Sequence, residues 1–353
     1  MRALLTIDHP AWAHQFRHVV HTLQQEGDAV HVLAIDRGGA GELLQAADIP
    51  YVCCARTTGK GFLQKLLLLL GLSVEHTYQG LRFRPDVFIG RASPMQAVAA
   101  WLCRKPHLLY EDTEVSKLSL RICKRLSTKI LTPRTFLTDL GEKQERVDTY
   151  KELFYLHPSV FTPSRQALRE VGFPVDESYI IFRFGAWQAS HDVGCRPLLA
   201  EEKLALVKRM EAYGRVFVSD EAGLPEALTK YRLPTPYPMI HHVLAFARLV
   251  YSEGATMASE SAMLGTHALY VNPIVSGTTT EISQRYELMY NFHEKEDRHT
   301  RAVEMAEALL KDTDLTRKGQ EKRSRLLQEK TDINAYFIAE ARRLAKMGRR
   351  GTP

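Results

Sequence analysis

The chain has 353 residues, of which 45% are hydrophobic and 25% charged, so it has the composition of a globular protein and the length of two domains. Its 47 basic and 41 acidic residues leave a net charge of +6, and five of the basic residues lie in the last 13, which argues against a basic nucleic-acid-binding body. The five cysteines lack zinc or disulfide spacing and no apolar run is long enough to span a bilayer, so we expect a cytoplasmic protein that binds no nucleic acid.

The first half of the chain alternates short apolar segments with amphipathic ones. It runs directly into a strand, and we expect no signal peptide. The predicted strands are residues 3–7, 29–35, 51–55, 86–90, 107–112 and 129–133, with helical patterns between them. Strands that alternate with helices indicate parallel βαβ units. We therefore predict a doubly wound, Rossmann-like α/β domain over residues 1–156.

The second half repeats this alternation after a proline-containing linker, residues 157–176. Its predicted strands are residues 179–184, 215–220, 249–253 and 267–273. They indicate a second Rossmann-like domain over residues 177–296, followed by helices and a basic tail over residues 297–353. Ligands of open parallel sheets bind beyond the carboxyl ends of the strands. We therefore expect the site in a central cleft that the two sheets face.

The segment “DHPAWAH” follows the first strand and places Asp8, His9 and His14 at the predicted cleft. The pKa of an ordinary histidine lies near neutral pH, so His14 is the candidate general base for an acceptor hydroxyl, with Asp8 as its orienting partner. The alternative is an aspartate that caps the helix and a buried core histidine. His14 and His18 share a helix face, but the pattern offers no third ligand, and we predict no metal site.

The segment “YEDTE” supplies Glu111 and Asp112 at the end of another apolar strand. Both carboxylates are candidates for acid–base chemistry at the cleft, with Glu111 as the first choice. A solvated helix N-terminus, which favours acidic residues, is the alternative interpretation. Lys151, in “YKE”, ends the first half, where it is either a counter-charge for phosphate or an ordinary surface lysine.

Residues 57–72, “TTGKGFLQKLLLLLGL”, lack the glycine spacing of a nucleotide-binding loop. Lys60 and Lys65 flank an apolar helix here. The pattern predicts either peripheral contact with the inner face of a membrane or a buried helix with a basic edge. The basic tail would add attraction to an anionic leaflet.

The loop “FRFGAWQASHD” follows the first strand of the second half. Arg183 can clamp a diphosphate through its fork of N–H donors. Gly185 and Trp187 can form a wall for the base or the sugar, and His191 lies within reach of the cleft. An exposed arginine and a core tryptophan are the alternative interpretation.

The stretch “SEGATMASESAML” predicts a helix that begins at Gly254, directly after a strand, and ends at Gly265. The first N–H groups of a helix have no partner within it and the helix dipole is positive there, so an anion is favoured. Gly254 and Ala255 leave room for that anion, and Glu260 can accept hydrogen bonds from an adjacent ribose. Close packing of a small-residue helix on its sheet accounts for the same composition and stays open.

The same stretch resembles the donor-nucleotide segment of GT-B enzymes, which include nucleotide-sugar glycosyltransferases and the hydrolysing UDP-N-acetylglucosamine 2-epimerases. The resemblance implies that Glu260 binds the ribose and that the diphosphate is bound by the turn before it, at Ser252, Gly254, Ala255 and Thr256. Segments along residues 1–290, among them “TIDHPAWAHQF”, “YEDTEVSKL” and “YGRVFVSDE”, together resemble a family known as domain of unknown function 354, which is grouped with these enzymes.

The resemblance implies a GT-B fold, in which the C-terminal helices can cross back onto the first half. It also implies a transferase that moves a sugar from a nucleoside diphosphate, with UDP favoured, to a hydroxyl of a glycan or lipid-linked acceptor in surface glycan synthesis. No cofactor or metal is implied. A hydrolysing 2-epimerase and a non-catalytic nucleotide-sugar-binding protein are the alternatives. The epimerases carry an acid in the turn that corresponds to “GRAS”, residues 90–93, where this chain has arginine. Glu253 and Glu260 are seven apart, whereas the glycosyltransferase pattern has its two glutamates eight apart.

Overall fold

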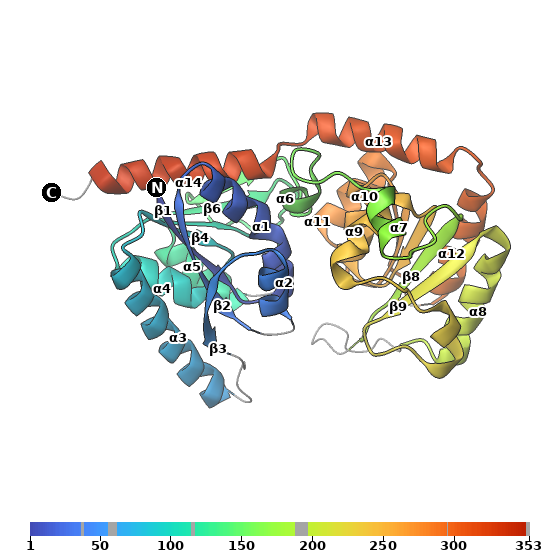
Figure 1. The fold of residues 1–353 in the computed structure, drawn as a ribbon, viewed down its shortest axis with the longest axis horizontal. Helices are drawn as coiled ribbons and strands as arrows, with labels where there is room; N and C mark the ends of the chain where they lie inside the picture. Colours follow the sequence, from blue (N-terminus) through green and yellow to red (C-terminus); the bar gives the residue numbers. More distant parts are fainter. Residues whose placement is uncertain (37–38, 56–61, 114–116, 188–196, 295, 351–353) are drawn as a thin grey trace. The chain divides into compact units, whose positions relative to one another are not determined.

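The computed structural model describes residues 1–36, 39–55, 62–113, 117–187, 197–294 and 296–350. The chain forms two compact units (Figure 1). The first unit comprises residues 1–160 together with 330–353, and the second comprises residues 161–329. The C-terminal segment, which the sequence analysis treats as one set of helices, is therefore divided between the two units.

A seven-stranded parallel sheet lies at the centre of the first unit, as the alternating pattern predicts. Its strands are β1 (Arg2–Ile7), β2 (Ala29–Ile35), β3 (Tyr51–Ala55), β4 (Val87–Gly90), β5 (His107–Tyr110), β6 (Lys129–Pro133) and β7 (Gln144–Val147). They are arranged in the order β3-β2-β1-β4-β5-β6-β7. The strand order reverses between β1 and β4, which makes this pair the switch point where open α/β sheets bind ligands. The short edge strand β7, with the sequence “QERV”, is too polar to be predicted from hydrophobicity.

Helices cover both faces of this sheet, so its central strands are continuous apolar runs. The helices are α1 (Pro10–Gln25), α2 (Ala40–Ala46), α3 (Phe62–Phe83), α4 (Pro94–Leu102), α5 (Lys117–Leu126), α6 (Leu153–Leu156) and α14 (Ile333–Arg350). Helices α3, α4 and α5 pack side by side in one layer, and α14 packs against α1 and α6 (Figure 1). The ring of Phe337 on α14 lies 5.6 Å from the rings of Phe16 and Phe154, so the C-terminal helix completes the core of the first unit.

The second unit contains a five-stranded parallel sheet in the order β12-β11-β10-β8-β9. Its strands are β8 (Tyr179–Phe184), β9 (Arg215–Asp220), β10 (Leu249–Ser252), β11 (Ala268–Val271) and β12 (Met289–Phe292). Numbered from β8, this is the doubly wound order 2-1-3-4-5, whose switch point lies between β8 and β10. Phe182 and Tyr251 stack at 4.7 Å on these two strands and lie in the buried core.

The helices of the second unit are mostly short. They are α7 (Arg165–Glu170), α8 (Ala200–Met210), α9 (Ile240–Phe246), α10 (Ala255–Met263), α11 (Gly277–Glu281), α12 (Arg298–Leu310) and α13 (Leu315–Glu329). Three 3₁₀ segments, η1 (Glu211–Tyr213), η2 (Glu226–Tyr231) and η3 (Tyr237–Met239), and the π-helical segment η4 (Ile282–Tyr286) accompany them. No described helix is both long and apolar enough to cross a membrane.

Gly319→Ala is expected to destabilise the second unit by about 1–3 kcal/mol, because overpacking forces backbone shifts. Helix α13 approaches the end of α10 so closely that a Cβ at position 319 would lie 2.1 Å from the carbonyl oxygen of Gly265. Gly265 has a φ of 82° and ends α10 in the left-handed conformation, so this carbonyl cannot easily move.

Denaturant unfolding with hydrogen exchange of α13 would measure this loss. Gly71→Ala in α3 is the matched control, because a Cβ there meets nothing within 4 Å. That change is expected to raise stability by up to about 1 kcal/mol, since alanine favours helix. A Gly319→Ala protein as stable as the parent would contradict the close packing of α10 and α13.

Candidate functional site

The switch point of the second sheet brings together the segments that the sequence analysis assigns to a nucleotide. Arg183 on β8 pairs in register with Ser252 on β10, and both lie at the carboxyl ends of their strands. Gly185 follows β8, and Gly254 and Ala255 follow β10. The structure therefore places Arg183, Gly185 and the turn before α10 at one edge of the second sheet.

Helix α10 begins without a side-chain cap. Gly254 is its N-cap residue in an extended conformation, and Ser252 Oγ accepts from the Gly254 N–H at 3.1 Å and donates to the Gly254 carbonyl at 2.8 Å. Ser252 is thereby used to shape the turn. Ala255 is partly buried and Thr256 is exposed. The N–H groups of the first turn point away from the helix body at a positive dipole end, which suits a phosphate.

Glu260 lies inside α10 and only 8% of its surface is exposed. His241 on α9 places its Nε2 3.1 Å from Glu260 Oε1, and His241 is itself 2% exposed. The histidine therefore orients the carboxylate that the sequence analysis assigns to the ribose. The sequence does not indicate that His241 orients Glu260, because the two residues lie on different helices and come together only in the fold.

Both terminal nitrogens of the Arg183 guanidinium form hydrogen bonds with other side chains. Nη1 donates to Ser219 Oγ at 2.6 Å and Nη2 donates to Glu221 Oε1 at 2.8 Å. Arg183 lies at the expected strand end, but its fork is held by β9 and the residue that follows it. A diphosphate would have to displace these two partners.

Glu253 ties the loop after β8 to the end of β10. Its Oε2 accepts from the Gly185 N–H and from Trp187 Nε1, each at 2.8 Å, and Trp187 adopts a left-handed φ of 50°. The Glu253 side chain is fully buried, and burial raises the pKa of its carboxyl group despite these two donors. Glu253 and Trp187 thus hold each other in place next to the helix turn.

In the first unit, the residues after β1 form the start of α1. His9, and not Asp8, is the N-cap residue, with Nδ1 accepting from the Ala11 N–H at 3.1 Å. Asp8 is partly buried, and His14 is 7% exposed with its ring 6.1 Å from that of Tyr155. The roles of His14 as base and Asp8 as its partner stay predictions.

Arg91 is the residue of this region that the sequence analysis did not assign to the site. It follows β4, is 4% exposed, and its Nη2 forms ion pairs with Glu111 and, at 2.6 Å, with Asp112. Nη1 donates to Gln15 Oε1 at 3.0 Å. The arginine in “GRAS” is visible in the sequence. Its partners are not, because they lie directly after β5 and on α1 and come close to it only in the fold.

The two carboxylates beside Arg91 are fully engaged. Glu111 also accepts N–H groups of the backbone, from Ala92 at 3.2 Å, Asp112 at 3.1 Å and Thr113 at 3.0 Å. Lys151 Nζ lies 3.1 Å from Asp112. Burial alone would raise the pKa of Asp112, but the charges of Lys151 and Arg91 outweigh it and hold that pKa below its ordinary value. This network positions the strand ends, and the lowered pKa keeps Asp112 charged at neutral pH. The acid–base role of Glu111 stays a prediction.

Three of the candidate residues have no described side chain. His191 falls outside the described residues, as does Lys60, and the side chain of Lys65 is likewise not described. Among the residues that the structure describes, no group of three or more His, Cys, Asp or Glu side chains is arranged to hold a metal ion.

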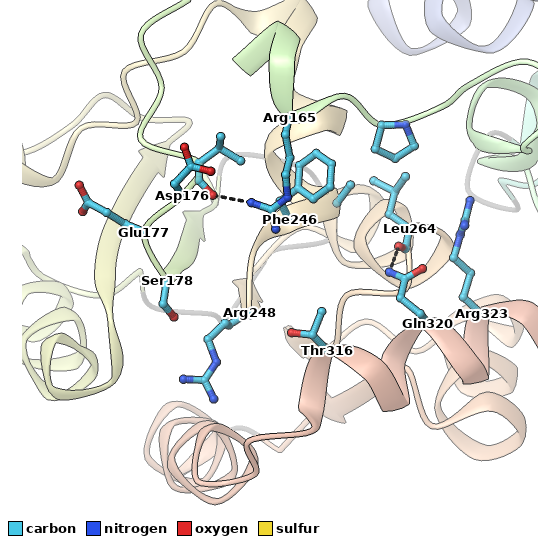
Figure 2. Close-up of a pocket in the computed structure, with 13 residues that line it drawn as sticks. Arg165, Asp176, Glu177, Ser178, Phe246, Arg248, Leu264, Thr316, Gln320 and Arg323 are labelled. Carbon is cyan, nitrogen blue, oxygen red and sulfur yellow. Dashed lines mark hydrogen bonds between the residues drawn. The ribbon is translucent and has the colours of Figure 1, made fainter. Parts of the chain in front are cut away.

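A pocket of about 580 Å³ lies at the opposite, amino-terminal edge of the second sheet (Figure 2). Ser178 and Arg248, which precede β8 and β10, line it together with Arg165 and Arg323. Each of the three arginines donates to a backbone carbonyl, namely that of Val175, Leu310 or Met263. Leu310 and Met263 end α12 and α10, so Arg248 and Arg323 cap helix C-termini. We assign no ligand to this pocket.

Known proteins resemble this chain in part of its sequence and in its fold. No protein-family model matches the chain. The N-acetylglucosamine transferase of Marinobacter nauticus that acts from UDP-N-acetylglucosamine on N-acetylmuramyl-(pentapeptide) pyrophosphoryl-undecaprenol is 32% identical over 118 residues, which are 31% of this chain and 32% of that protein. The match thus spans about a third of the length of such curated relatives.

Solved structures match over nearly the whole chain. The UDP-GlcNAc 2-epimerase of Neisseria meningitidis has a TM-score of 0.66 at 12% identity and covers 90% of this chain and 94% of its own. The MurG of Acinetobacter baumannii has a TM-score of 0.58 at 17% identity and covers 97% of this chain and 100% of its own. These likenesses show the fold. It is the predicted GT-B fold.

Proposed function

We propose that the chain is a GT-B glycosyltransferase that moves a sugar from a nucleoside-diphosphate sugar, with UDP as the nucleotide, to a hydroxyl of a glycan or lipid-linked acceptor. The observation that carries this proposal is the switch point of the second sheet, where an uncapped helix start and a buried, histidine-oriented glutamate, Glu260, lie on one helix. The two features match a diphosphate and its adjacent ribose. The named activity of the curated relatives supports UDP and a lipid-linked acceptor.

The transfer has simple requirements. The acceptor oxygen attacks C1 of the sugar, the bond from C1 to the β-phosphate oxygen breaks, the hydroxyl proton passes to a base, and the nucleoside diphosphate leaves. The start of α10 would stabilise the charge on the leaving diphosphate. His14, with Asp8 as its predicted orienting partner, is the proposed base on the first unit, where the acceptor would bind. The proposal routes no step through a metal or cofactor.

The network around Arg91 favours a transferase over a hydrolysing 2-epimerase. Epimerisation needs acids that remove and return a proton at C2 of the sugar. In this chain Arg91 stands in the turn where epimerases carry an acid, and it pairs with Glu111 and Asp112. Glu111 also accepts three backbone hydrogen bonds, so its two oxygens are already used within the protein.

Calorimetric titration with UDP, GDP, CDP and their sugar conjugates tests the donor site. We expect micromolar binding of UDP and its conjugates. Turnover with a UDP-sugar in the absence of acceptor then separates the functions, because a transferase hydrolyses its donor only slowly whereas an epimerase releases UDP and epimerised sugar at full rate. A chain that binds UDP but shows neither activity with lipid-linked or glycan acceptors would be the non-catalytic binding protein. No binding of any nucleotide would remove the proposal.

Membership in the domain of unknown function 354 family is proposed from the sequence segments quoted above. The family resemblance and the curated relatives agree on nucleotide-sugar chemistry. The resemblance rests on short motifs, and the match to the curated relative rests on 118 residues, which are 31% of this chain.

We further propose peripheral contact of the first unit with the inner face of the cell membrane through α3. A stripe of apolar side chains along this helix is exposed: Leu67 (60%), Leu70 (56%), Val74 (70%), Tyr78 (53%) and Leu81 (61%). The spacing of three and four residues places them on one helix face. Helix α5 lies in the same layer, separated from α3 by α4, and contributes Lys117, Arg121, Lys124 and Arg125 and no acidic residue. An apolar helix face in one layer with basic residues suits an anionic bilayer surface.

Leu70→Asp combined with Val74→Asp is expected to weaken binding to phosphatidylglycerol vesicles about tenfold or more, because two exposed apolar side chains no longer enter the bilayer surface. Vesicle sedimentation at two salt concentrations measures this. Val275→Asp, a similarly exposed residue on the second unit, is the control. Equal vesicle binding by the double variant and the control would contradict a membrane role for α3.

A further inference from the structure

Arg298 is a buried cation without a carboxylate partner in the part of the chain that the structure describes. It is the first residue of α12, directly after Asp297 in the left-handed conformation, and only 4% of its surface is exposed. No carboxylate of the described residues lies within ion-pair distance of its guanidinium. A buried charge is costly unless it is paired, and a cation at the positive end of a helix adds to that cost. This arrangement points to an anionic ligand.

The structure shows two contacts of the Arg298 guanidinium, a hydrogen bond from Nε and a face that lies over an aromatic ring. Its Nε donates to His299 Nε2 at 3.2 Å, and its Cζ lies 5.3 Å from the centre of the Trp187 ring. Because His299 Nε2 accepts this bond, the proton of a neutral His299 is on Nδ1, which lies 2.6 Å from the hydroxyl of Tyr251. Within the described residues, no hydrogen bond from Nη1 or Nη2 of Arg298 is found. These two groups are the donors that bind phosphate bidentately.

Arg298 belongs to the same sheet edge as the start of α10. Trp187, which its guanidinium covers, donates through Nε1 to Glu253, and Glu253 directly precedes the N-cap Gly254. Glu253 is the acid of this cluster, but its Oε2 is used by two N–H donors and its Oε1 lies 3.9 Å from His299. It therefore compensates the charge of Arg298 over a distance without pairing with it.

We infer that Arg298 binds the diphosphate of the donor nucleotide, opposite the first-turn N–H groups of α10. The inference rests on the proposed function, which supplies the diphosphate. It gives Arg298 the role that the sequence analysis assigned to Arg183, whose two Nη groups are held by Ser219 and Glu221. The guanidinium stacked on Trp187 is fixed in orientation before the ligand arrives, as a bidentate phosphate contact requires.

Calorimetry of Arg298→Met with uridine, UMP and UDP tests the inference. Methionine keeps an apolar chain against Trp187 and removes the donors. Loss of charge-assisted hydrogen bonds is expected to weaken UDP binding about 10- to 100-fold and UMP binding less, with uridine affinity unchanged within about twofold. Arg298→Lys keeps the charge without the fork and should recover part of the UDP affinity. If Arg298→Met does not fold, the UDP affinity of Arg298→Lys tests the inference instead.

The outcomes separate this inference from the proposed function. Arg301→Met is the matched control on the same helix, because Arg301 is exposed and pairs with Glu294, and it should leave all three affinities unchanged. Unchanged UDP affinity in Arg298→Met, or an equal loss for uridine and UDP, would overturn the role of Arg298 while the donor site stands. A parent protein that binds none of the three ligands would overturn both.

Discussion

Arg91→Met is expected to lower the free energy of unfolding of the first unit by about 3–5 kcal/mol, the usual effect of removing one partner from a buried ion pair. The guanidinium of Arg91 joins the ends of β4 and β5 and the start of α1 through Glu111, Asp112 and Gln15. Without it, Glu111 is a buried carboxylate with backbone donors but no counter-charge. Lys151 still pairs with Asp112, so the loss falls mainly on Glu111.

The effect must be measured on the first unit alone, because a two-unit chain need not unfold in one step. In a Trp187→Phe background the remaining tryptophans, Trp12 and Trp101, both belong to the first unit and report its denaturant unfolding. Arg134→Met is the control, since its ion pair with Asp148 is exposed and should contribute about 0–1 kcal/mol. Combining Arg91→Met with Glu111→Gln should restore part of the loss, because the unpaired charge is removed.

The pH dependence gives an independent check. The folded-state pKa of Asp112 is held below its ordinary value of 3.8, so its contribution to stability is present above that pH and is lost as the pH falls through the lower folded value. Arg91→Met removes part of this lowering. The stability difference between parent and variant should therefore be largest near neutral pH and narrow below pH 3.8. If the stability difference between parent and variant were constant with pH, or if the variant lost less than 1 kcal/mol, Arg91 would contribute through packing and not through its charge.

The fold could be predicted from the sequence because its signal is local. Runs such as residues 29–35 and 179–184 are mostly apolar on both faces, as strands covered by helices on both sides must be, and they match β2 and β8 in place. β7 and β12 were missed because they are four-residue edge strands whose pairing, not their composition, defines them. The return of α14 to the first unit was expected only from the resemblance to GT-B enzymes, since an amphipathic pattern does not indicate which surface the helix covers.

From the sequence, residues of the candidate site could be proposed only where they directly follow a predicted strand. Gly254 and Glu260 lie on one helix, so their spacing along the chain already fixes their relation in space. His241, Arg298 and Arg91 were missed because each acts through a neighbour brought close only by the fold: Glu260, Trp187 and Glu111 respectively. Burial of a charged side chain is what reveals them, and burial cannot be read from one sequence.

Glu260→Ala is expected to weaken the binding of uridine, UMP and UDP by a similar factor, about 10- to 100-fold, because all three ligands share the ribose and a hydrogen bond to a charged group is among the stronger ones. This equal loss contrasts with Arg298→Met, where the loss should grow with the number of phosphates. His241 holds Glu260 Oε1 at 3.1 Å, so Glu260→Gln, which can still accept from the histidine, should lose less affinity than alanine.

Calorimetry of the three ligands against both Glu260 variants measures this pattern, and Glu226→Ala, an exposed glutamate of the same unit, is the control. The ribose contact and the phosphate contact are predicted on different residues, Glu260 on α10 and Arg298 on α12, so their effects should add when both are changed. Unchanged UDP affinity in Glu260→Ala would mean that the small residues of α10 serve packing against the sheet. The donor site would then rest on the helix start and Arg298 alone, and the ribose would have to be bound by a residue outside this helix.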